Sequence, residues 1–203
     1  MEFQGTSYKG SARSPLVFED RSLAVKANGG NFHEAVMRGR CFCVASQAGV
    51  TSQAGLSATT PVLTLYNPAG SGTNLILWHA AAQFEVAFVA AASVWLAAGT
   101  NTVAAAVTGT LTAAHRNLKL GLSQSPVART FTVATLPAAP VAIDLLGVGL
   151  TGAITTAAAL APLAKWYNGS VILTPGTNLT IQTSTASGAS GMLCSFIWEE
   201  VDA

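Results

Sequence analysis

Two of the three cysteines stand close together, and their spacing is the one in this chain that best suits metal chemistry. Cys41 and Cys43 are separated by one residue, so on a β-strand both thiolates would point to the same face and could bind one metal ion. No two further ligands follow nearby in sequence, and Cys194 leaves an odd number of cysteines without a disulfide framework. We therefore interpret the pair as half-buried strand residues, and we predict no metal site and no cofactor.

Acidic residues are sparse in the centre of the chain. Glu85 and Asp144 are the only acids between Cys41 and Trp198. Both stand in apolar, strand-like surroundings, where an ion pair with Arg116 or Arg129 is the simpler interpretation. We predict that the chain is not an enzyme, and we keep as an alternative a hydrolase whose activity is lost when Asp144 or Glu85 is changed.

The remaining titratable residues do not form a catalytic pattern either. His33, His79 and His115 are too far apart in sequence to form a spaced metal motif. The one pair of adjacent carboxylates, Glu199 and Glu200, would point to opposite faces of a strand and could not act on the same bond.

The loop 67–72, Asn-Pro-Ala-Gly-Ser-Gly, superficially resembles a phosphate-binding loop. It lacks the Gly-Lys-Ser/Thr that such loops require, and a β-rich run follows it in place of a helix whose N-terminus could bind phosphate. We interpret it as a chain reversal.

Aromatic residues suggest one possible ligand, a sugar. Trp166, Tyr167 and Asn168 place aromatic faces beside a planar polar group in one predicted loop, the combination on which glycans stack and form hydrogen bonds. A glycan-binding module is therefore an alternative function, weighed against ordinary core or interface packing of these aromatics.

The elements that must position these residues are predicted to be β-strands. Between residues 61 and 78, two apolar runs flank the turn 67–72, and Leu63, Leu65, Leu75 and Leu77 alternate as expected for one face of a hairpin. A second hairpin is predicted from 171–173 and 179–183 around Pro175-Gly176, a pair typical of a type II turn.

The whole pattern gives about eight to ten short strands separated by Gly, Pro or Asn. Such a pattern predicts an all-β, jelly-roll-like β-sandwich. The best helix candidate is 157–161, which Pro162 ends.

Charge is rare and unevenly distributed. Only 9% of the 203 residues are charged, half are hydrophobic and the net charge is +1, so we expect other chains to cover much of the surface. We predict an extended N-terminal arm over residues 1–45, with a short strand at 16–26, and a β body over residues 46–203. A flexible tail is the alternative for the arm. The arm carries six basic residues: Lys9, Arg13, Arg21, Lys26, Arg38 and Arg40.

Nucleic acid and membrane are not expected partners. Acids interrupt the basic residues of the arm, so no concentrated positive field forms. The most apolar run, 86–98, is too short to span a bilayer, and residues 1–13 lack the apolar stretch of a signal peptide. We expect synthesis in the cytoplasm, where unpaired cysteines stay reduced.

Several segments together resemble small structural proteins encoded by tailed bacteriophages. The resemblance is carried by 60–75 (TPVLTLYNPAGSGTNL), by 34–36, by 45–50 and by the closing Ile197-Trp198-Glu199-Glu200. It implies a virion component, a jelly-roll decoration or cement protein that caps junctions between subunits of the major capsid protein as a homotrimer. On this hypothesis residues 1–45 grip the capsid surface, residues 46–203 form the trimeric body, and the mechanism is adhesion. The alternative is a host-glycan-binding module of a phage fibre or spike, with Trp166, Tyr167 and Asn168 as the glycan contact.

Overall fold

The structure is a computed structural model that describes residues 5–6, 12–13, 32–84, 92–100, 106–111, 114–149, 163–186 and 191–203. The chain divides into two units, Met1–His33 and Glu34–Ala203. In the first unit, β1 (Gly5–Thr6) and β2 (Ala12–Arg13) pair antiparallel. The strand predicted at 16–26 and the helix predicted at 157–161 lie outside the described residues.

The second unit is built almost entirely of strands, with a short helix, α1 (His33–Met37), at its start. The strands are β3 (Cys41–Ala45), β4 (Leu63–Tyr66), β5 (Thr73–Phe84), β6 (Ala92–Thr100), β7 (Thr108–Leu111), β8 (Arg116–Asn117), β9 (Arg129–Thr135), β10 (Val141–Gly149), β11 (Leu163–Leu173), β12 (Thr177–Thr183) and β13 (Met192–Asp202).

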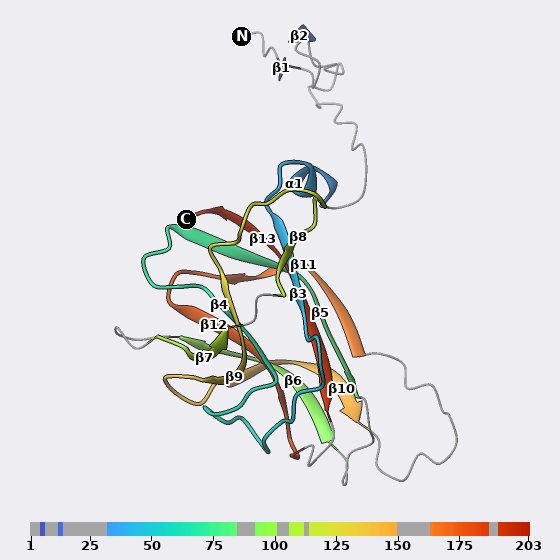
Figure 1. Cartoon of the computed structure of the whole chain (residues 1–203), viewed down its shortest axis with the longest axis vertical. Coiled ribbons are helices and arrows are strands. Elements are labelled where there is room, and N and C mark those ends of the chain that lie inside the picture. Colours follow the sequence, from blue (N-terminus) through green and yellow to red (C-terminus); the bar gives the residue numbers. More distant parts are fainter. Residues whose placement is uncertain are drawn as a thin grey trace, which may run out of the picture. The chain divides into compact units, whose positions relative to one another are not determined.

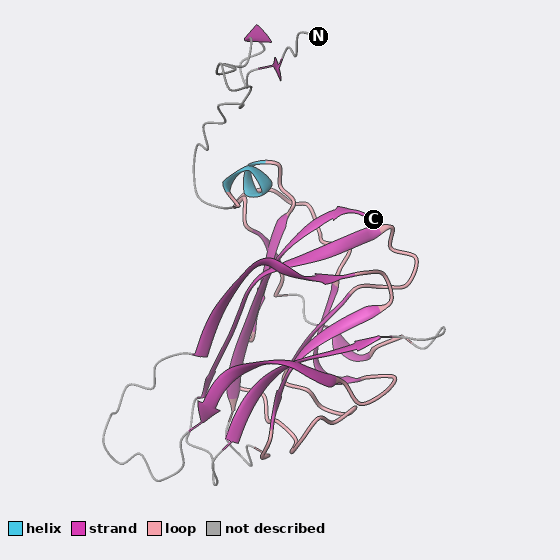
Figure 2. Cartoon of the chain, turned by 180° about the vertical axis from the view of Figure 1, so that it is seen from behind, coloured by secondary structure: helices cyan, strands magenta, loops and turns pink. Residues whose placement is uncertain are grey.

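These strands form two antiparallel sheets packed face to face (Figures 1 and 2). The six-stranded sheet has the order β10-β6-β12-β4-β9-β7, and the five-stranded sheet has the order β11-β5-β13-β3-β8. Numbering β3, β4, β5, β6, β10, β11, β12 and β13 from 1 to 8 gives the orders 1-8-3-6 and 2-7-4-5. This is the arrangement of a jelly roll, so the predicted fold class is confirmed.

The strands β7, β8 and β9 are an insertion into this plan between β6 and β10. β8 extends the five-stranded sheet beyond β3, and β9 followed by β7 extends the six-stranded sheet beyond β4. The insertion therefore covers one pair of sheet edges. At the other side, β10 and β11 remain the edge strands.

Large apolar side chains from both sheets fill the space between them. Trp198, Phe42, Phe196 and Leu63 are among the largest fully buried side chains. The Phe42 and Trp198 rings stack with centroids 6.0 Å apart. Burying each such side chain stabilises the fold by roughly 1.5–3 kcal/mol, so the alternating apolar pattern of the strands directs the assembly of the two sheets.

The two predicted hairpins are wrong as strand pairings. β4 lies in the six-stranded sheet and β5 in the five-stranded sheet, so Leu65 and Leu75 enter the core from opposite layers. The same holds for β11 and β12. The turn itself is as predicted, because Gly176 has φ +87° and the Thr177 N–H donates to the Thr174 carbonyl at 3.1 Å.

Asn67 connects the two turns that cross between the layers. Its side-chain amide donates to the carbonyl of Thr73 at 2.7 Å and to that of Leu173 at 2.9 Å, and its oxygen accepts from Ser71 Oγ at 2.7 Å. A single buried side chain thus joins the β4–β5 turn to the end of β11, and the two crossings support each other.

The predicted arm is shorter in the structure than residues 1–45. β3 pairs with β13 on one side and with β8 on the other, and Cys41, Phe42 and Val44 are buried. Residues 34–45 therefore belong to the second unit, because β3 is an inner strand of the five-stranded sheet.

Candidate interaction surfaces

Burial makes all three cysteines poor candidates for chemistry. Cys41 is fully buried and its pKa is raised to about 12, first by burial and then by the charge of Glu199. Burial also raises the pKa of Cys43, whose side chain is half-buried, and that of Cys194. Thiols in this state are unreactive at neutral pH. Within the described ranges, no three His, Cys, Asp or Glu side chains are grouped so that they could hold a metal ion.

Asp144 pairs with a different partner from either arginine that the sequence suggested. Its carboxylate accepts from Lys165 Nζ and from the Tyr167 hydroxyl, each at 2.7 Å. Asp144 lies on β10 and the two donors lie on β11, so the cluster joins the edge strands of the two sheets. Burial raises the pKa of Asp144, but the hydrogen bonds from Lys165 and Tyr167 and the Lys165 charge outweigh burial and hold the pKa below its usual value. Glu85 lies outside the described residues.

The terminal carboxylates make separate structural contacts, as their adjacency predicts. Glu199 forms an ion pair with Arg40 at 2.8 Å. Glu200 accepts the backbone N–H groups of Val127 at 3.0 Å and Ala128 at 2.9 Å, and it accepts Nε1–H of Trp198 at 3.2 Å. Both side chains therefore fasten β13 to neighbouring segments.

The structure separates the three residues of the predicted glycan contact. Trp166 is 52% exposed, and its ring lies 4.6 Å from that of His79. Tyr167 is 8% exposed, packs in the core and donates to Asp144. Asn168 is exposed, with φ +50° in the irregular stretch of β11 that opposes β5. Trp166 and Asn168 are therefore available at the surface, whereas Tyr167 is not.

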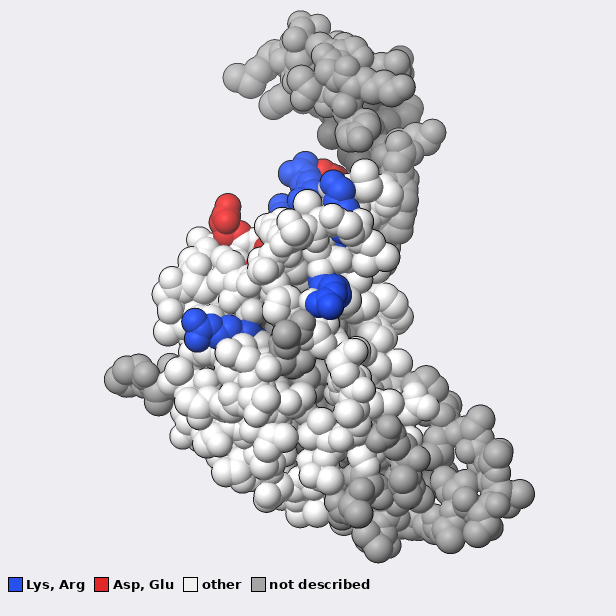
Figure 3. Space-filling view, in the orientation of Figure 1, with Lys and Arg blue, Asp and Glu red and all other residues white. Residues whose placement is uncertain are grey.

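The basic residues predicted for the arm also separate. Arg38 pairs with Glu34 on α1, and Arg40 pairs with Glu199, both in the second unit. Arg13 belongs to β2 in the first unit, and Lys9, Arg21 and Lys26 lie outside the described residues. Figure 3 shows Lys and Arg gathered mainly near α1, with most of the remaining visible described surface uncharged.

The outer face of the five-stranded sheet has two neighbouring rows of mainly small or apolar residues that the sequence analysis did not identify. Cross-strand pairing aligns Ala164, Ala81, Ser195 and Ala45 in one row over β11, β5, β13 and β3. The next row consists of Trp166, His79, Ile197, Cys43 and Arg116. We call these two rows the flat face. Each of its residues is exposed or half-buried, and Arg116 is its one charged member.

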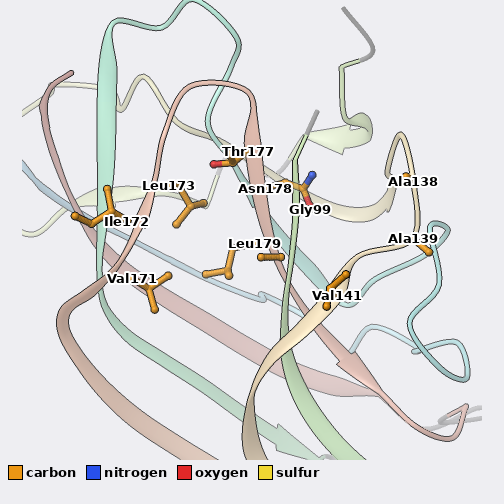
Figure 4. Close-up of a pocket in the computed structure, with 11 residues that line it drawn as sticks. Gly99, Ala138, Ala139, Val141, Val171, Ile172, Leu173, Thr177, Asn178 and Leu179 are labelled. Atoms are coloured by element: carbon orange, nitrogen blue, oxygen red, sulfur yellow. The ribbon is translucent and has the colours of Figure 1, made fainter. Parts of the chain in front are cut away.

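A groove opens where the two sheets separate at their free edges (Figure 4). It has a volume of about 560 Å³. Val171 and Leu173 of β11, Leu179 of β12 and Val141 of β10 line it, together with Ala139 from the loop before β10. The lining is mainly apolar, so the groove suits aliphatic side chains better than a charged ligand.

Comparisons of the chain with protein-family models, curated proteins and solved structures give no match. The described helix, α1, is far too short to cross a bilayer, and no other described segment forms a membrane-spanning helix.

The flat face and the groove could not be found from the sequence, because both depend on which strands become neighbours. The signal present in the sequence was indirect: strands β5, β11 and β13 place Ala, Ser and Ile, in place of charged residues, at positions that alternate with the core residues.

Proposed function

We propose that this chain is a non-enzymatic structural protein of a tailed-bacteriophage virion, which binds the major capsid protein on the outside of the head and stabilises it. The flat face is the observation that carries this proposal. A broad sheet face lined by Ala, Ser, Ile and Trp suits a large protein surface better than it suits a small substrate.

The shape and charge of the flat face agree with adhesion to a shell. One of its rows consists of three alanines and one serine, whose side chains are short. A second flat protein surface can therefore approach the backbone of the sheet closely. Only Arg116 among its nine residues is charged, so little desolvation of charge opposes burial.

The first unit adds a second contact in this proposal. Residues 1–33 form a unit of their own and are joined directly to the second unit. Four of the predicted capsid-contact residues, Lys9, Arg13, Arg21 and Lys26, belong to it. Two tethered contacts raise the effective concentration of each for its site, and three copies in a trimer multiply this effect.

The test uses heads of the phage whose genome encodes the chain, stripped of their minor proteins. The purified full chain is expected to sediment with these heads and to raise their melting temperature. Ser195→Arg, which places a charge in the centre of the flat face, should weaken binding at least tenfold. The matched control is Ser125→Arg, at an exposed loop position, and it should bind like the unmodified chain.

Two results would contradict the proposal. If the unmodified chain does not bind heads, the proposal is wrong as a whole. If Ser195→Arg binds as tightly as Ser125→Arg, the flat face is not the contact.

A host-glycan-binding module is the second candidate, because Trp166 is 52% exposed and Asn168 is exposed on the same strand. It predicts binding to cell-surface glycans that Trp166→Ala abolishes. Tyr167→Ala would reduce glycan binding only by disturbing the core. A loss of binding that follows changes of Trp166 and Asn168, with the fold retained, would therefore indicate a direct glycan contact.

A further inference from the structure

A turn at Asn168 and Gly169 interrupts β11 and combines surface exposure with an unusual backbone. Asn168 has φ +50° and Gly169 has φ +83°, so two successive residues lie in the left-handed region, as in a type I′ turn. The pairing of β11 with β5 runs to Trp166 and resumes at Val171. Asn168 is exposed and Gly169 is half-buried. The turn is therefore held at both ends and stands outside the ladder.

The turn lies over the outer face of the five-stranded sheet. A Cβ added at Gly169 would stand 3.1 Å from Cγ2 of Ile76. Ile76 alternates with the core residues Leu75 and Leu77, so its side chain belongs to the outer face. Trp166, a member of the flat face, precedes the turn by two residues. A new charge on the turn would therefore stand beside the flat face.

An exposed Asn-Gly pair can deamidate without a catalyst. The backbone nitrogen of Gly169 loses its proton to hydroxide and attacks Cγ of Asn168. The N–Cγ bond forms, the Cγ–Nδ2 bond breaks, and the leaving nitrogen takes up a proton from water and departs as ammonia. Water then opens the resulting cyclic imide at either of its carbonyls and breaks that carbon's bond to nitrogen. The product is an aspartate or an isoaspartate, and it carries a carboxylate in place of the amide.

The other described asparagines are protected from this reaction. Asn67 is buried and precedes a proline, whose nitrogen carries no proton. Asn117 is 5% and Asn178 2% exposed, so water has little access to either. Asn74 is half-buried within the paired length of β5. Asn168 is thus the one exposed asparagine in the part of the chain that the structure describes, and it is followed by glycine.

We propose that Asn168 is a site of spontaneous deamidation in the folded chain, which places a carboxylate beside the flat face. Within the described ranges no hydrogen bond holds its side-chain amide. Gly169 has no Cβ to hinder the approach of its nitrogen to Cγ. Because the turn stands outside the ladder, it can rotate into the reactive geometry while β11 stays paired on either side. The inference goes beyond the proposed function and does not depend on it.

The experiment incubates the purified full chain in mildly alkaline water enriched in heavy oxygen. Peptide mapping by mass spectrometry measures conversion at Asn168, and the label marks product that formed during the incubation. A synthetic peptide of residues 163–173 gives the rate of the unfolded sequence. Conversion in the folded chain should proceed within about tenfold of the peptide's rate, since the turn stands outside the ladder. It should slow at mildly acidic pH, where hydroxide is scarcer.

Three variants isolate the site. Asn28-Gly29 is the other Asn-Gly pair of the sequence, so Asn28→Gly provides a background in which ion exchange reports mainly on Asn168. In that background, Asn168→Gly keeps the positive φ without strain and should abolish the acidic species. Gly169→Ala retains the amide but adds a Cβ beside the attacking nitrogen, so conversion should slow at least about tenfold.

The inference and the proposed function can fail separately. A folded chain in which Asn168 stays intact while the peptide is converted overturns the inference, because the fold would then protect the turn. Unchanged conversion in Gly169→Ala also overturns it, because the cyclic imide would not be the route. Conversion at Asn168 in a chain that ignores heads contradicts the proposed function alone. A chain that binds heads and keeps the amide contradicts this inference alone.

Discussion

Asn67 is the residue on which the two crossings between the sheets depend. Its side chain is fully buried and serves two backbone carbonyls and one hydroxyl. Asn67→Ala would leave the carbonyls of Thr73 and Leu173 without these donors inside the fold, which we expect to lower the free energy of unfolding by about 3 kcal/mol. Urea titration followed by tryptophan fluorescence measures this change.

Asn178 provides a matched control for Asn67. It is 2% exposed, and its Oδ1 has no hydrogen-bond partner in the described part of the chain. Asn178→Ala should therefore destabilise the fold less than half as much as Asn67→Ala. Equal effects of the two substitutions would show that burial, and not the hydrogen bonds of Asn67, sets its contribution.

The Asp144 cluster makes stability depend on pH in the acid range. Hydrogen bonds from Lys165 and Tyr167 hold the pKa of Asp144 below that of an unfolded aspartate, about 3.9. Because the folded pKa is the lower one, the ion pair stabilises the fold fully above about pH 4, and this stabilisation is lost as pH falls through the folded pKa. Asp144→Asn should thus lower the melting temperature at pH 7 and have progressively less effect below pH 4.

Melting curves at fixed protein concentration, from pH 7 down to pH 2.5, compare Asp144→Asn with the unmodified chain. A difference in melting temperature that stays constant over this range would mean that the ionised pair contributes nothing and that only packing changed. Lys165→Met removes the opposite partner and should reproduce the same pH profile.

The position of β3 determines how many N-terminal residues can be removed without unfolding the second unit. It is hydrogen-bonded on both sides, to β13 and β8, and its apolar residues are buried. Removal of residues 1–31 should leave the melting temperature within a few degrees of the full chain. Removal of residues 1–45 should leave no cooperative transition, because β13 then loses one of its two neighbours, the core loses Phe42 and Val44, and Glu199 loses Arg40.

Circular dichroism at 218 nm, recorded during heating, checks both truncations. Cooperative unfolding of the chain without residues 1–45 would contradict the role assigned to β3. Loss of folding on removal of residues 1–31 would instead mean that the first unit supports the second.

The sequence predicted elements better than it predicted their partners. Alternating leucines around 67–72 and the Pro175-Gly176 turn identified β4, β5, β11 and β12, since strand periodicity and turn chemistry are local properties. A tight turn between two apolar runs looks the same whether the runs pair or cross between layers. In this chain the two runs cross between layers, and the side chain of Asn67 donates a hydrogen bond to the carbonyl of Leu173, 106 residues away.

The candidate surfaces show the same limit. The motif Trp166-Tyr167-Asn168 predicted one contact from neighbouring residues, but alternation along β11 exposes Trp166 and buries Tyr167. The flat face joins residues from β3, β5, β11 and β13, and Cys43 and Ile197 become neighbours only through strand pairing. Arg38 and Arg40 could not be recognised as body residues until β3 was placed beside β13.

For the molecule as a whole, the insertion β7–β9 makes the two sides of the jelly roll structurally different. The insertion covers the edges of β3 and β4, and β10 and β11 are the edge strands on the other side among the described strands. On the proposed function, the flat face contacts the shell, and this contact relies little on charge. The first unit carries four of the six basic residues predicted to contact the capsid, and salt should weaken its contact.

Salt should therefore distinguish the two capsid contacts. Ionic strength screens a contact made by the charges of Lys9, Arg13, Arg21 and Lys26 but hardly affects burial of apolar surface. The full chain should bind heads more weakly as NaCl rises and then reach a plateau, and the chain without residues 1–31 should bind at that plateau at every salt concentration. Cosedimentation across a salt series measures both curves. Binding that falls continuously to zero in high salt would assign the whole interaction to charge and leave the flat face without a role in it.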